Sequence, residues 1–404
     1  EEVMAKRQIG APRFYCDVLS YLKSIGMYYG VNSKDYGESP NQEKPFTMNP
    51  YQPYGFNLPQ NIGKSRLRFW INEDPVATGS MNHIPQHELG KLLAYHNPSD
   101  DEHHSSGWFA GILGHNLASL GTSAVIQRFY GKHDDEDIKF SNQSEFKEIV
   151  NFEEATLIEP AGSAGKPKYD GFSLWEITNK NTSTLQSRFS VAEFTFEKND
   201  GNQNEVPWGD NNSLEIGAFT AGIFIEAPNS PDLSVKKTLE MSGISVNETI
   251  AGNTLVNIKH KGVPNWGDQP AWTLQKTDGR DYTNVANRAR RIWDMSFSYI
   301  SDDNLFDAAQ NSNSFFNDTF DQFDEEETYS VSNFDTSMSS FFKLTQNGAL
   351  PFIFCPDSKA TRIVDGVEVD NPEFAICMLD QDSISCTQVA HRTWNVSLAI
   401  REVY

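Results

Sequence analysis

Alternation of apolar and polar residues is the dominant pattern of this chain, and it is clearest in two stretches toward the C-terminus. Residues Arg291–Tyr299 and Arg392–Ile400 read almost alike at an offset of 101 residues (392 − 291). In each stretch the large apolar residues fall on alternate positions, which is the period of a strand with one buried face. The pattern predicts two half-buried strands in a β domain that closes at the C-terminus of this sequence, and nothing in that block indicates catalysis.

Similar short runs occur between residue 65 and about residue 230, separated by Gly, Asn, Asp and Pro. Many short strands divided by turn residues favour a sandwich or a jelly roll. The interval Ser80–Ser106 interrupts them and predicts a short helix and a polar loop. The predicted strands are Arg66–Ile71, Trp108–Leu113, Ser123–Tyr130, Phe172–Ile177, Phe189–Phe196 and Leu214–Phe219.

The first sixty residues have a mixed pattern. Apolar residues within 14–25, at Val18, Leu19, Leu22 and Ile25, have the spacing of one short amphipathic helix. From residue 28 to residue 61 the chain is rich in Tyr, Gly, Asn and Pro, a composition that cannot close a core of its own. We therefore expect an extended arm that lies across a neighbouring subunit in an assembly or wraps its own domain in a monomer.

A chain of 404 residues is too long for one ordinary core, so two or three domains are expected. The predicted organisation is a helix and arm over residues 1–60, a jelly roll over 61–230, and a C-terminal β-sandwich over 231–404. An acidic insertion interrupts the last domain at 301–340. Residues 235–285 fit either β unit.

Composition excludes several classes of function. The 27 Phe, 14 Tyr and 8 Trp favour half-buried pleated surfaces, and the net charge of −22 repels a phosphate backbone. We therefore expect a mainly β protein that does not bind nucleic acid. No stretch approaches the roughly twenty apolar residues of a membrane span, and the N-terminus lacks a secretory apolar core, so we expect a soluble protein with no membrane partner. The sequence from Met4 resembles an internal start.

A resemblance to a known family arises in the middle of the chain. Gly114-His115-Asn116-Leu117, Leu174–Thr178 and Ile216–Phe219 resemble the discoidin-like (galactose-binding-like) jelly roll of many tailed-bacteriophage virion proteins. That resemblance implies a fold and a setting but defines no active site.

The downstream half resembles minor tail and tail-tip structural proteins of such phages, particularly marine ones. The resemblance implies a tail protein of the virion that forms a homo-oligomeric ring or hub with copies of itself and neighbouring virion proteins. A host surface glycan is a further partner class that it allows. The motifs that carry it are Ser230–Ser234, Trp266–Asp268, Arg290–Trp293, Pro351–Phe354 and Trp394–Val403.

Four scattered cysteines do not form a disulfide scaffold or a zinc module. Cys16, Cys355, Cys377 and Cys386 are predicted to be buried, inert thiols. Cys377 and Cys386 lie nine residues apart (386 − 377) in a strand-turn-strand stretch and could face each other. A disulfide between them would matter only outside a reducing cytosol.

Histidines offer weak candidates for chemistry. His83 and His87 have a four-residue spacing, but Pro85 lies between them and no Glu follows the first, so the zincin motif is absent. His96, His103 and His104 follow nearby without completing a metal site. His115 is expected to bond backbone at a strand end, because no nucleophile with an orienting acid is suggested by spacing.

The acidic insertion leaves two alternatives open. Its carboxylates could ligate calcium, yet the EF-hand order is absent, and a solvated insertion between strands is favoured. Interleaved Phe residues indicate docking on a partner. The acids are Asp302, Asp303, Asp307, Asp318, Asp321, Asp324 and Glu325–Glu327, and the aromatics are Phe315, Phe316, Phe320 and Phe323.

Three functions remain: a structural protein of a phage tail, which we favour, a carbohydrate-binding module of a receptor-binding or lectin-like protein, and a glycan-cleaving enzyme. We expect no catalytic residues, metal or cofactor, and assign no ligand-binding residues. Burial of Tyr51, Tyr54 and Phe56 by a neighbouring subunit would favour assembly. Exposed loop aromatics in a groove would favour glycan binding, and the candidates are Trp108, Trp208, Trp266 and Trp272. An enzyme would need two carboxylates in a cleft.

Overall fold

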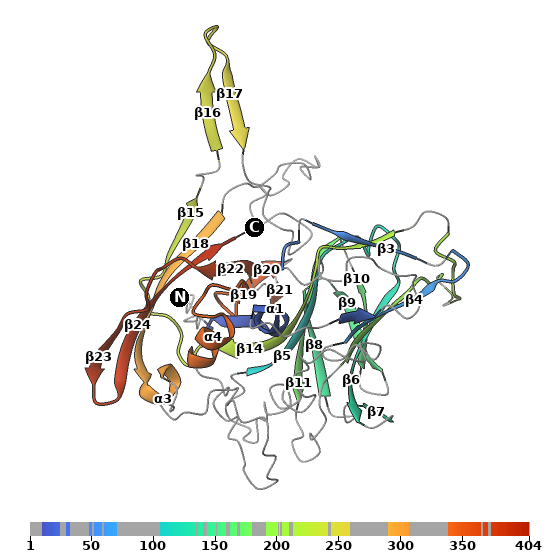
Figure 1. The fold of residues 1–404 in the computed structure, drawn as a ribbon, viewed down its shortest axis with the longest axis horizontal. Coiled ribbons are helices and arrows are strands. Elements are labelled where there is room, and N and C mark those ends of the chain that lie inside the picture. Colours follow the sequence, from blue (N-terminus) through green and yellow to red (C-terminus); the bar gives the residue numbers. More distant parts are fainter. Residues whose placement is uncertain are drawn as a thin grey trace, which may run out of the picture. The chain divides into compact units, whose positions relative to one another are not determined.

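The structure is a computed structural model of the whole chain (Figure 1). The residues that it describes are 10–24, 30–32, 48–50, 52–58, 60–70, 106–133, 136–139, 144–150, 152–158, 162–167, 170–179, 191–200, 202, 204–209, 213–240, 244–258, 290–306, 338–364, 367–370 and 373–403. The fold is mainly β with antiparallel pairing, as the alternation predicts. No helix in these ranges is long and apolar enough to span a membrane.

The chain forms two compact units, each built from separate segments. Unit 1 comprises residues 1–16, 224–238 and 292–403, and unit 2 comprises residues 17–223 and 239–291. The domain boundaries that the sequence predicts, near residues 60 and 230, assume that each domain is one continuous segment of the chain. Here the chain enters each unit more than once, because strands distant in sequence are paired.

Unit 1 is centred on an antiparallel sheet with the order β15-β18-β24-β22-β19-β1 (Figure 1). β23 pairs with β24, and β20 and β21 form a separate hairpin. Two short helices, α3 and α4, accompany the sheet. The elements are β1 (Arg13–Asp17), β15 (Lys236–Glu240), β18 (Arg290–Ser301), α3 (Asp302–Leu305), α4 (Met338–Leu344), β19 (Phe352–Cys355), β20 (Thr361–Val364), β21 (Val367–Asp370), β22 (Ala375–Leu379), β23 (Cys386–Ala390) and β24 (Thr393–Glu402).

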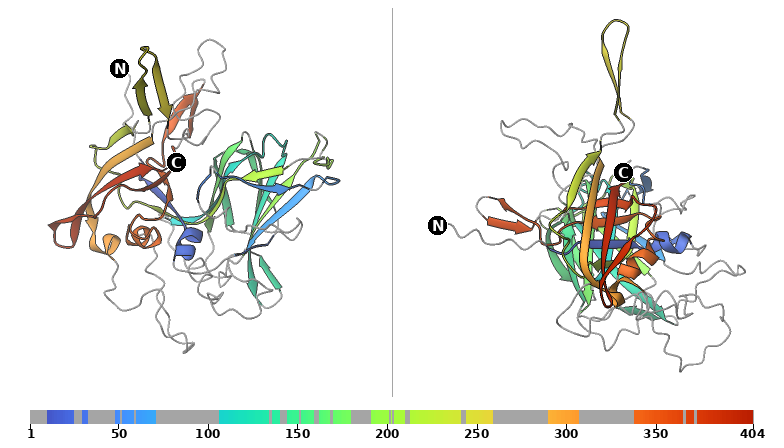
Figure 2. Two further views of the ribbon diagram at one scale, coloured as in Figure 1. Left: turned by 45° about the horizontal axis from the view of Figure 1, so that its top comes forward. Right: turned by 90° about the vertical axis from the view of Figure 1, so that its left-hand side faces the viewer.

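The two similar stretches of sequence are neighbouring strands. β18 and β24 pair antiparallel and lie side by side in Figure 2. Ser296 faces Ser397, and their hydroxyl oxygens are 3.0 Å apart. Both strands turn alternate apolar residues, such as Trp293 and Val396, into the core. The prediction of two half-buried strands is confirmed, and their likeness follows from covering the same core.

An aromatic cluster fills the core of unit 1. The ring of Phe14 in β1 lies 4.5 Å from that of Phe341 in α4, measured between centroids, and 5.4 Å from that of Phe354 in β19. Trp293 contacts Phe354 edge to face at 5.4 Å. Such ring pairs add stabilisation beyond their buried area, so β1 is held by its side chains as well as by its strand pairing.

Unit 2 contains two larger antiparallel sheets and two smaller ones (Figure 1). The first has the order β14-β5-β11-β8, and the second has the order β2-β4-β12-β6-β10-β9 with β7 paired to β6. β3 pairs with β13, and β16 pairs with β17. The remaining element is α1. The bounds are α1 (Val18–Ser24), β2 (Gly30–Asn32), β3 (Tyr54–Asn57), β4 (Lys64–Trp70), β5 (Ser106–His115), β6 (Ala124–His133), β7 (Glu136–Lys139), β8 (Ser144–Val150), β9 (Phe152–Ile158), β10 (Gly162–Pro167), β11 (Gly171–Asn179), β12 (Val191–Glu197), β13 (Ser213–Ile216), β14 (Ala218–Glu226), β16 (Ile244–Glu248) and β17 (Thr254–Ile258).

Aromatic rings join the two larger sheets of unit 2. Phe194 of β12 lies 5.7 Å from Trp175 of β11 and 5.2 Å from Phe219 of β14, measured between ring centroids. All three side chains are buried. β12 belongs to the second sheet and β11 and β14 to the first, so these rings form a core between sheets.

The predicted helix over residues 14–25 is wrong in its first part. β1 occupies Arg13–Asp17, and α1 begins only at Val18. Phe14, Tyr15 and Cys16 are all buried, although they point to alternating sides of a strand. A strand buried on both faces lacks the polar alternation that marks half-buried strands, so its apolar run is continuous with the helical pattern that follows it.

The predicted arm over residues 28–61 contributes two short strands where it is described. β2 pairs with β4, and β3 pairs with β13. Phe56 is buried by the chain's own residues, which fits the alternative in which the arm wraps its own domain, so its burial gives no support to assembly. Tyr54 packs edge to face on Phe56 at 4.7 Å, and Tyr51 lies outside the described residues.

One predicted strand is divided in two. The run Leu214–Phe219 breaks at Gly217 into β13 and β14. A Cβ atom at Gly217 would lie 2.3 Å from the carbonyl oxygen of Pro50. The backbone of residue 50 therefore occupies the space that a side chain would need, and a glycine is required there.

The cysteines differ in part from expectation. Cys16, Cys355 and Cys377 are buried free thiols, as predicted, and Cys386 is partly exposed. Cys377 is paired in register with Glu402 of β24, whereas Cys386 is paired with Val396. The two thiols therefore lie beside positions of β24 that are six residues apart (402 − 396), and they do not face each other.

Candidate functional site

His115 lies at the end of β5 in a buried polar group. Its Nε2 atom is 2.7 Å from Ser173 Oγ, and the backbone N–H of Leu117 donates to its Nδ1 at 3.4 Å. The backbone contact agrees with the role expected of His115 at a strand end. Both His115 and Ser173 are buried, so this hydroxyl is not presented as a nucleophile.

The charge state of His115 follows from its burial. Removal of the imidazole from water lowers its pKa to about 4, although Asp170 opposes the shift. Asp170 in turn accepts hydrogen bonds from the backbone N–H and the hydroxyl of Ser119. The imidazole is therefore neutral at pH 7, and the group stabilises the turn after β5.

Asp17 joins α1 to β14 within unit 2. Its carboxylate accepts hydrogen bonds from the backbone N–H of Ser20 at 2.9 Å and from the Ser20 hydroxyl at 2.5 Å. It also accepts from the Thr220 hydroxyl at 2.9 Å and the Ala221 N–H at 3.2 Å. Asp17 thus caps the first turn of α1, and four donors converge on one buried carboxylate.

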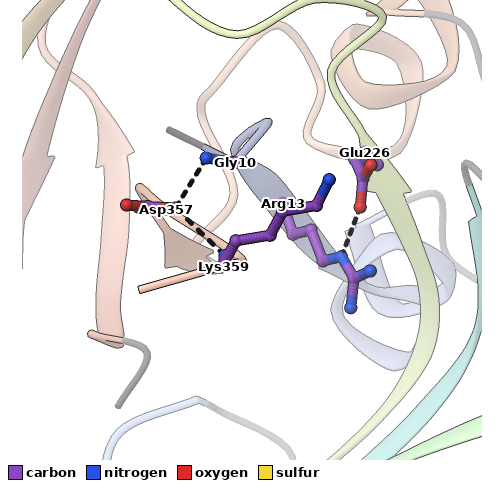
Figure 3. Close-up of polar contacts among 5 residues, drawn as sticks. All are labelled: Gly10, Arg13, Glu226, Asp357 and Lys359. Atoms are coloured by element: carbon purple, nitrogen blue, oxygen red, sulfur yellow. Dashed lines mark hydrogen bonds and ion pairs between the residues drawn. The ribbon is translucent and has the colours of Figure 1, made fainter. Parts of the chain in front are cut away.

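The start of the described chain is fixed to unit 1 by a second polar cluster, shown in Figure 3. Asp357 accepts hydrogen bonds from the N–H groups of Gly10 at 2.8 Å and Lys359 at 3.0 Å. Arg13 donates at 2.6 Å to Glu226, the last residue of β14, which belongs to the unit 1 segment 224–238. Asp357 orders the turn after β19, and these contacts hold β1 from both of its sides.

Substitution of Gly10 tests this attachment. A Cβ atom at Gly10 would lie 2.7 Å from the backbone nitrogen of Lys359 and 2.8 Å from Asp357 Oδ1. We expect Gly10→Ala to lower the free energy of unfolding by about 2 kcal/mol, because the backbone must shift and the bond to Asp357 is lost. Urea denaturation measures the change. Asp357→Asn keeps one acceptor oxygen and should lower the free energy of unfolding by less than Gly10→Ala does. Equal losses in the two variants would contradict the role given to the close packing at Gly10.

The hairpin of β16 and β17 is the most exposed apolar feature among the described residues. Val246 is 63% exposed, Leu255 is 57% exposed, and Ile250 in the turn is fully exposed. The register pairs Asn247 with Leu255 one step beyond the position of Val246, so Val246 and Leu255 lie on opposite faces of the hairpin. We call β16, β17 and their turn the apolar hairpin.

The apolar hairpin has few contacts to hold it. Within the described chain its two strands pair only with each other. The turn is ordered locally, because Asn253 N–H donates to the Thr249 hydroxyl and Gly252 N–H donates to the Thr249 carbonyl. An isolated two-stranded hairpin is at best marginally stable in water. A surface that covers its apolar residues would stabilise it.

The other candidates from sequence contribute little to a site. His83, His87, His96, His103, His104, Trp266 and Trp272 lie outside the described residues, as do residues 307–337 of the acidic insertion and residues 80–105, where a helix and a loop were predicted. Trp208 is buried and carries Lys198 over its ring, so it is not an exposed aromatic. Trp108 lies within β5 rather than in a loop. In the described ranges no group of three or more His, Cys, Asp or Glu side chains could hold a metal ion.

Sequence reasoning missed the apolar hairpin. Its signal was available in the alternation of residues 244–258, which lie in the segment left between the two predicted β units. Comparison with known proteins adds no relative: no protein family, no curated protein and no solved structure matches this chain.

Proposed function

We propose that this chain is a structural component of a tailed-bacteriophage virion, in the tail, tail tip or adaptor, and that it assembles as a homo-oligomeric ring or hub. The motifs quoted above support the setting. The apolar hairpin carries the proposal of assembly, because Val246, Ile250 and Leu255 are exposed on an element that needs cover. The two sheets of unit 2, with aromatic rings between them, support its assignment as a discoidin-like jelly roll.

A second copy of this chain is the occupant that fits the charge of the apolar hairpin. The chain carries a net charge of −22, so two copies repel each other over most of their surface. Residues 244–258 contain one charged side chain, Glu248. Two copies therefore repel each other least where residues 244–258 meet. A basic partner would instead bind the acidic surface of the rest of the chain.

The strand edges of the apolar hairpin also favour pairing. β16 and β17 contain neither Lys nor Pro, the residues that commonly protect an exposed edge. The outer N–H and C=O groups of these strands have no strand partner within the described residues, so a neighbour can add strands to them, and the exposed apolar side chains on the two faces can pack against that neighbour. In a closed ring each copy would make this contact with the next.

The test replaces the exposed apolar residues of the hairpin together. We expect the wild-type chain to form a defined oligomer and the triple variant Val246→Ser, Ile250→Ser, Leu255→Ser to bind its neighbour roughly 100-fold more weakly. Light scattering should then give the variant the monomer mass of 45.5 kDa.

A matched control removes apolar side chains of similar exposure elsewhere. Leu233→Ser with Val235→Ser alters two exposed residues of unit 1 and should leave the oligomer intact. A monomeric wild-type chain, or a triple variant with unchanged mass, would contradict assembly through the apolar hairpin.

Placement in the virion is tested by immunogold labelling of purified particles, and unlabelled tails would contradict it.

A further inference from the structure

A β-bulge in unit 1 presents a tyrosine to solvent. The register of β18 and β24 pairs Phe297 with Val396 and Ile300 with Trp394, which leaves one extra residue in β18. Ser298 and Tyr299 thus lie opposite the single residue Asn395. Bulges of this kind redirect a side chain and are frequent at functional sites.

Tyr299 adopts a backbone conformation that its residue type disfavours. Its φ angle is +62°, in the left-handed region, and its side chain is 74% exposed. Glycine is the residue that favours this region, and a bulky residue there is strained. An exposed ring adds little to the core, so stability alone does not explain a tyrosine at this position.

Neighbouring side chains hold the bulge in place. Asn395 Oδ1 accepts a hydrogen bond from the Tyr299 N–H at 3.1 Å. The Ser298 hydroxyl donates to Asp232 at 2.8 Å, and Asn229 donates to the Ser298 carbonyl at 3.4 Å. Side chains therefore bind the Tyr299 N–H and the Ser298 carbonyl, and these contacts support the tyrosine.

The beginning of β24 is held in a similar way. The indole N–H of Trp394 donates to Asp302 at 2.6 Å, and Phe306 packs edge to face on Trp394 at 5.0 Å. These contacts join α3 to β24 beside the bulge. Preorganisation of this kind lowers the entropic cost of binding a ligand.

Small neutral polar residues share the outward face with Tyr299. Ser296 and Ser397 contact each other there, and Thr387 of β23 is paired in register with Asn395. Hydroxyl and amide groups both donate and accept hydrogen bonds, as sugar hydroxyls do. The C–H groups of a sugar ring carry partial positive charge, which suits the negative face of an aromatic ring.

We infer that the bulge face, comprising Ser296, Tyr299, Thr387, Asn395 and Ser397, is a saccharide-binding subsite for neutral, hexose-containing polysaccharides. Tyr299 stacks on a sugar ring, and the hydroxyl and amide groups bind its hydroxyls. The inference goes beyond the proposed assembly role and rests on different residues in a different unit.

Affinity electrophoresis in gels that contain dextran, mannan or galactan tests the inference. The full chain should be retarded by at least one of these neutral polysaccharides, and Tyr299→Gly should weaken that retardation roughly tenfold. Because glycine relieves the backbone strain, the melting temperature of this variant should stay constant or rise by about 1 °C.

Two controls separate stacking from general damage. Tyr299→Phe keeps an aromatic face and should bind nearly as well as wild type, and Val389→Ser changes an exposed residue of β23 and should bind normally. No retardation in any of the three gels, or undiminished retardation of Tyr299→Gly, would overturn the inference. A loss of stability in Tyr299→Gly would assign Tyr299 a structural role instead.

Discussion

Acidification from pH 7 to pH 4 is expected to lower the contribution of His115 to the free energy of unfolding by about 3 kcal/mol. Burial depresses the pKa of this imidazole from 6.5 to about 4 in the folded chain. Above pH 6.5 the His115 imidazole is neutral in both the folded and the unfolded state, so its protonation does not change the free energy of unfolding there. As the pH falls, the unfolded state binds a proton first, so stability is lost progressively between pH 6.5 and pH 4.

Comparison with a variant that does not titrate isolates this effect. Urea denaturation of wild type and His115→Asn, each at pH 7 and pH 4.5, measures the four free energies of unfolding. The wild-type chain should lose more stability on acidification than the variant does. Equal losses would show that the proton uptake of other groups, and not that of His115, governs acid stability.

Asp17→Ala should lower the free energy of unfolding by about 3 kcal/mol, because four hydrogen-bond donors lose one buried acceptor. The N-cap of α1 is lost with it. Asp200 offers a matched control, since Asn202 and Asn204 donate to it in a fully exposed turn. Asp200→Ala should change stability little, and similar losses in both variants would contradict a special role for burial.

The pH dependence of Asp17 runs opposite to that of His115. Burial raises the pKa of Asp17 above its ordinary value of 3.8, and hydrogen bonds from Ser20, Thr220 and Ala221 counteract part of the shift. The unfolded state then loses its proton first as the pH rises. The contribution of Asp17 is therefore largest below pH 3.8 and is lost as the pH rises through the folded-state pKa.

Alternation identified the half-buried strands well, because one polar face leaves a clear period of two. The paired strands β18 and β24 are the best example. β1 was missed because both of its faces are buried and its residues show no alternation. The break at Gly217 depends on the backbone of Pro50, which is 167 residues distant (217 − 50), and no local pattern contains that contact.

The candidate sites were harder to predict from the sequence than the strands were. The sequence of β16 and β17 predicts strands, but whether a third strand covers them depends on tertiary structure. The bulge at Tyr299 depends on a register shift against β24 and on the side chain of Asn395, which lies 96 residues away (395 − 299). Exposure and backbone φ angle, the two properties that single out Tyr299, are not encoded in a local pattern.

Hydrogen exchange of the wild-type chain tests assembly through the apolar hairpin most directly. The amide groups of β16 and β17 are compared at about 1 µM and about 100 µM protein. We predict that their protection rises with concentration while that of β5 and β11 stays constant, because a second copy would cover only the hairpin. Protection of β16 and β17 that does not change with concentration would contradict assembly through the apolar hairpin.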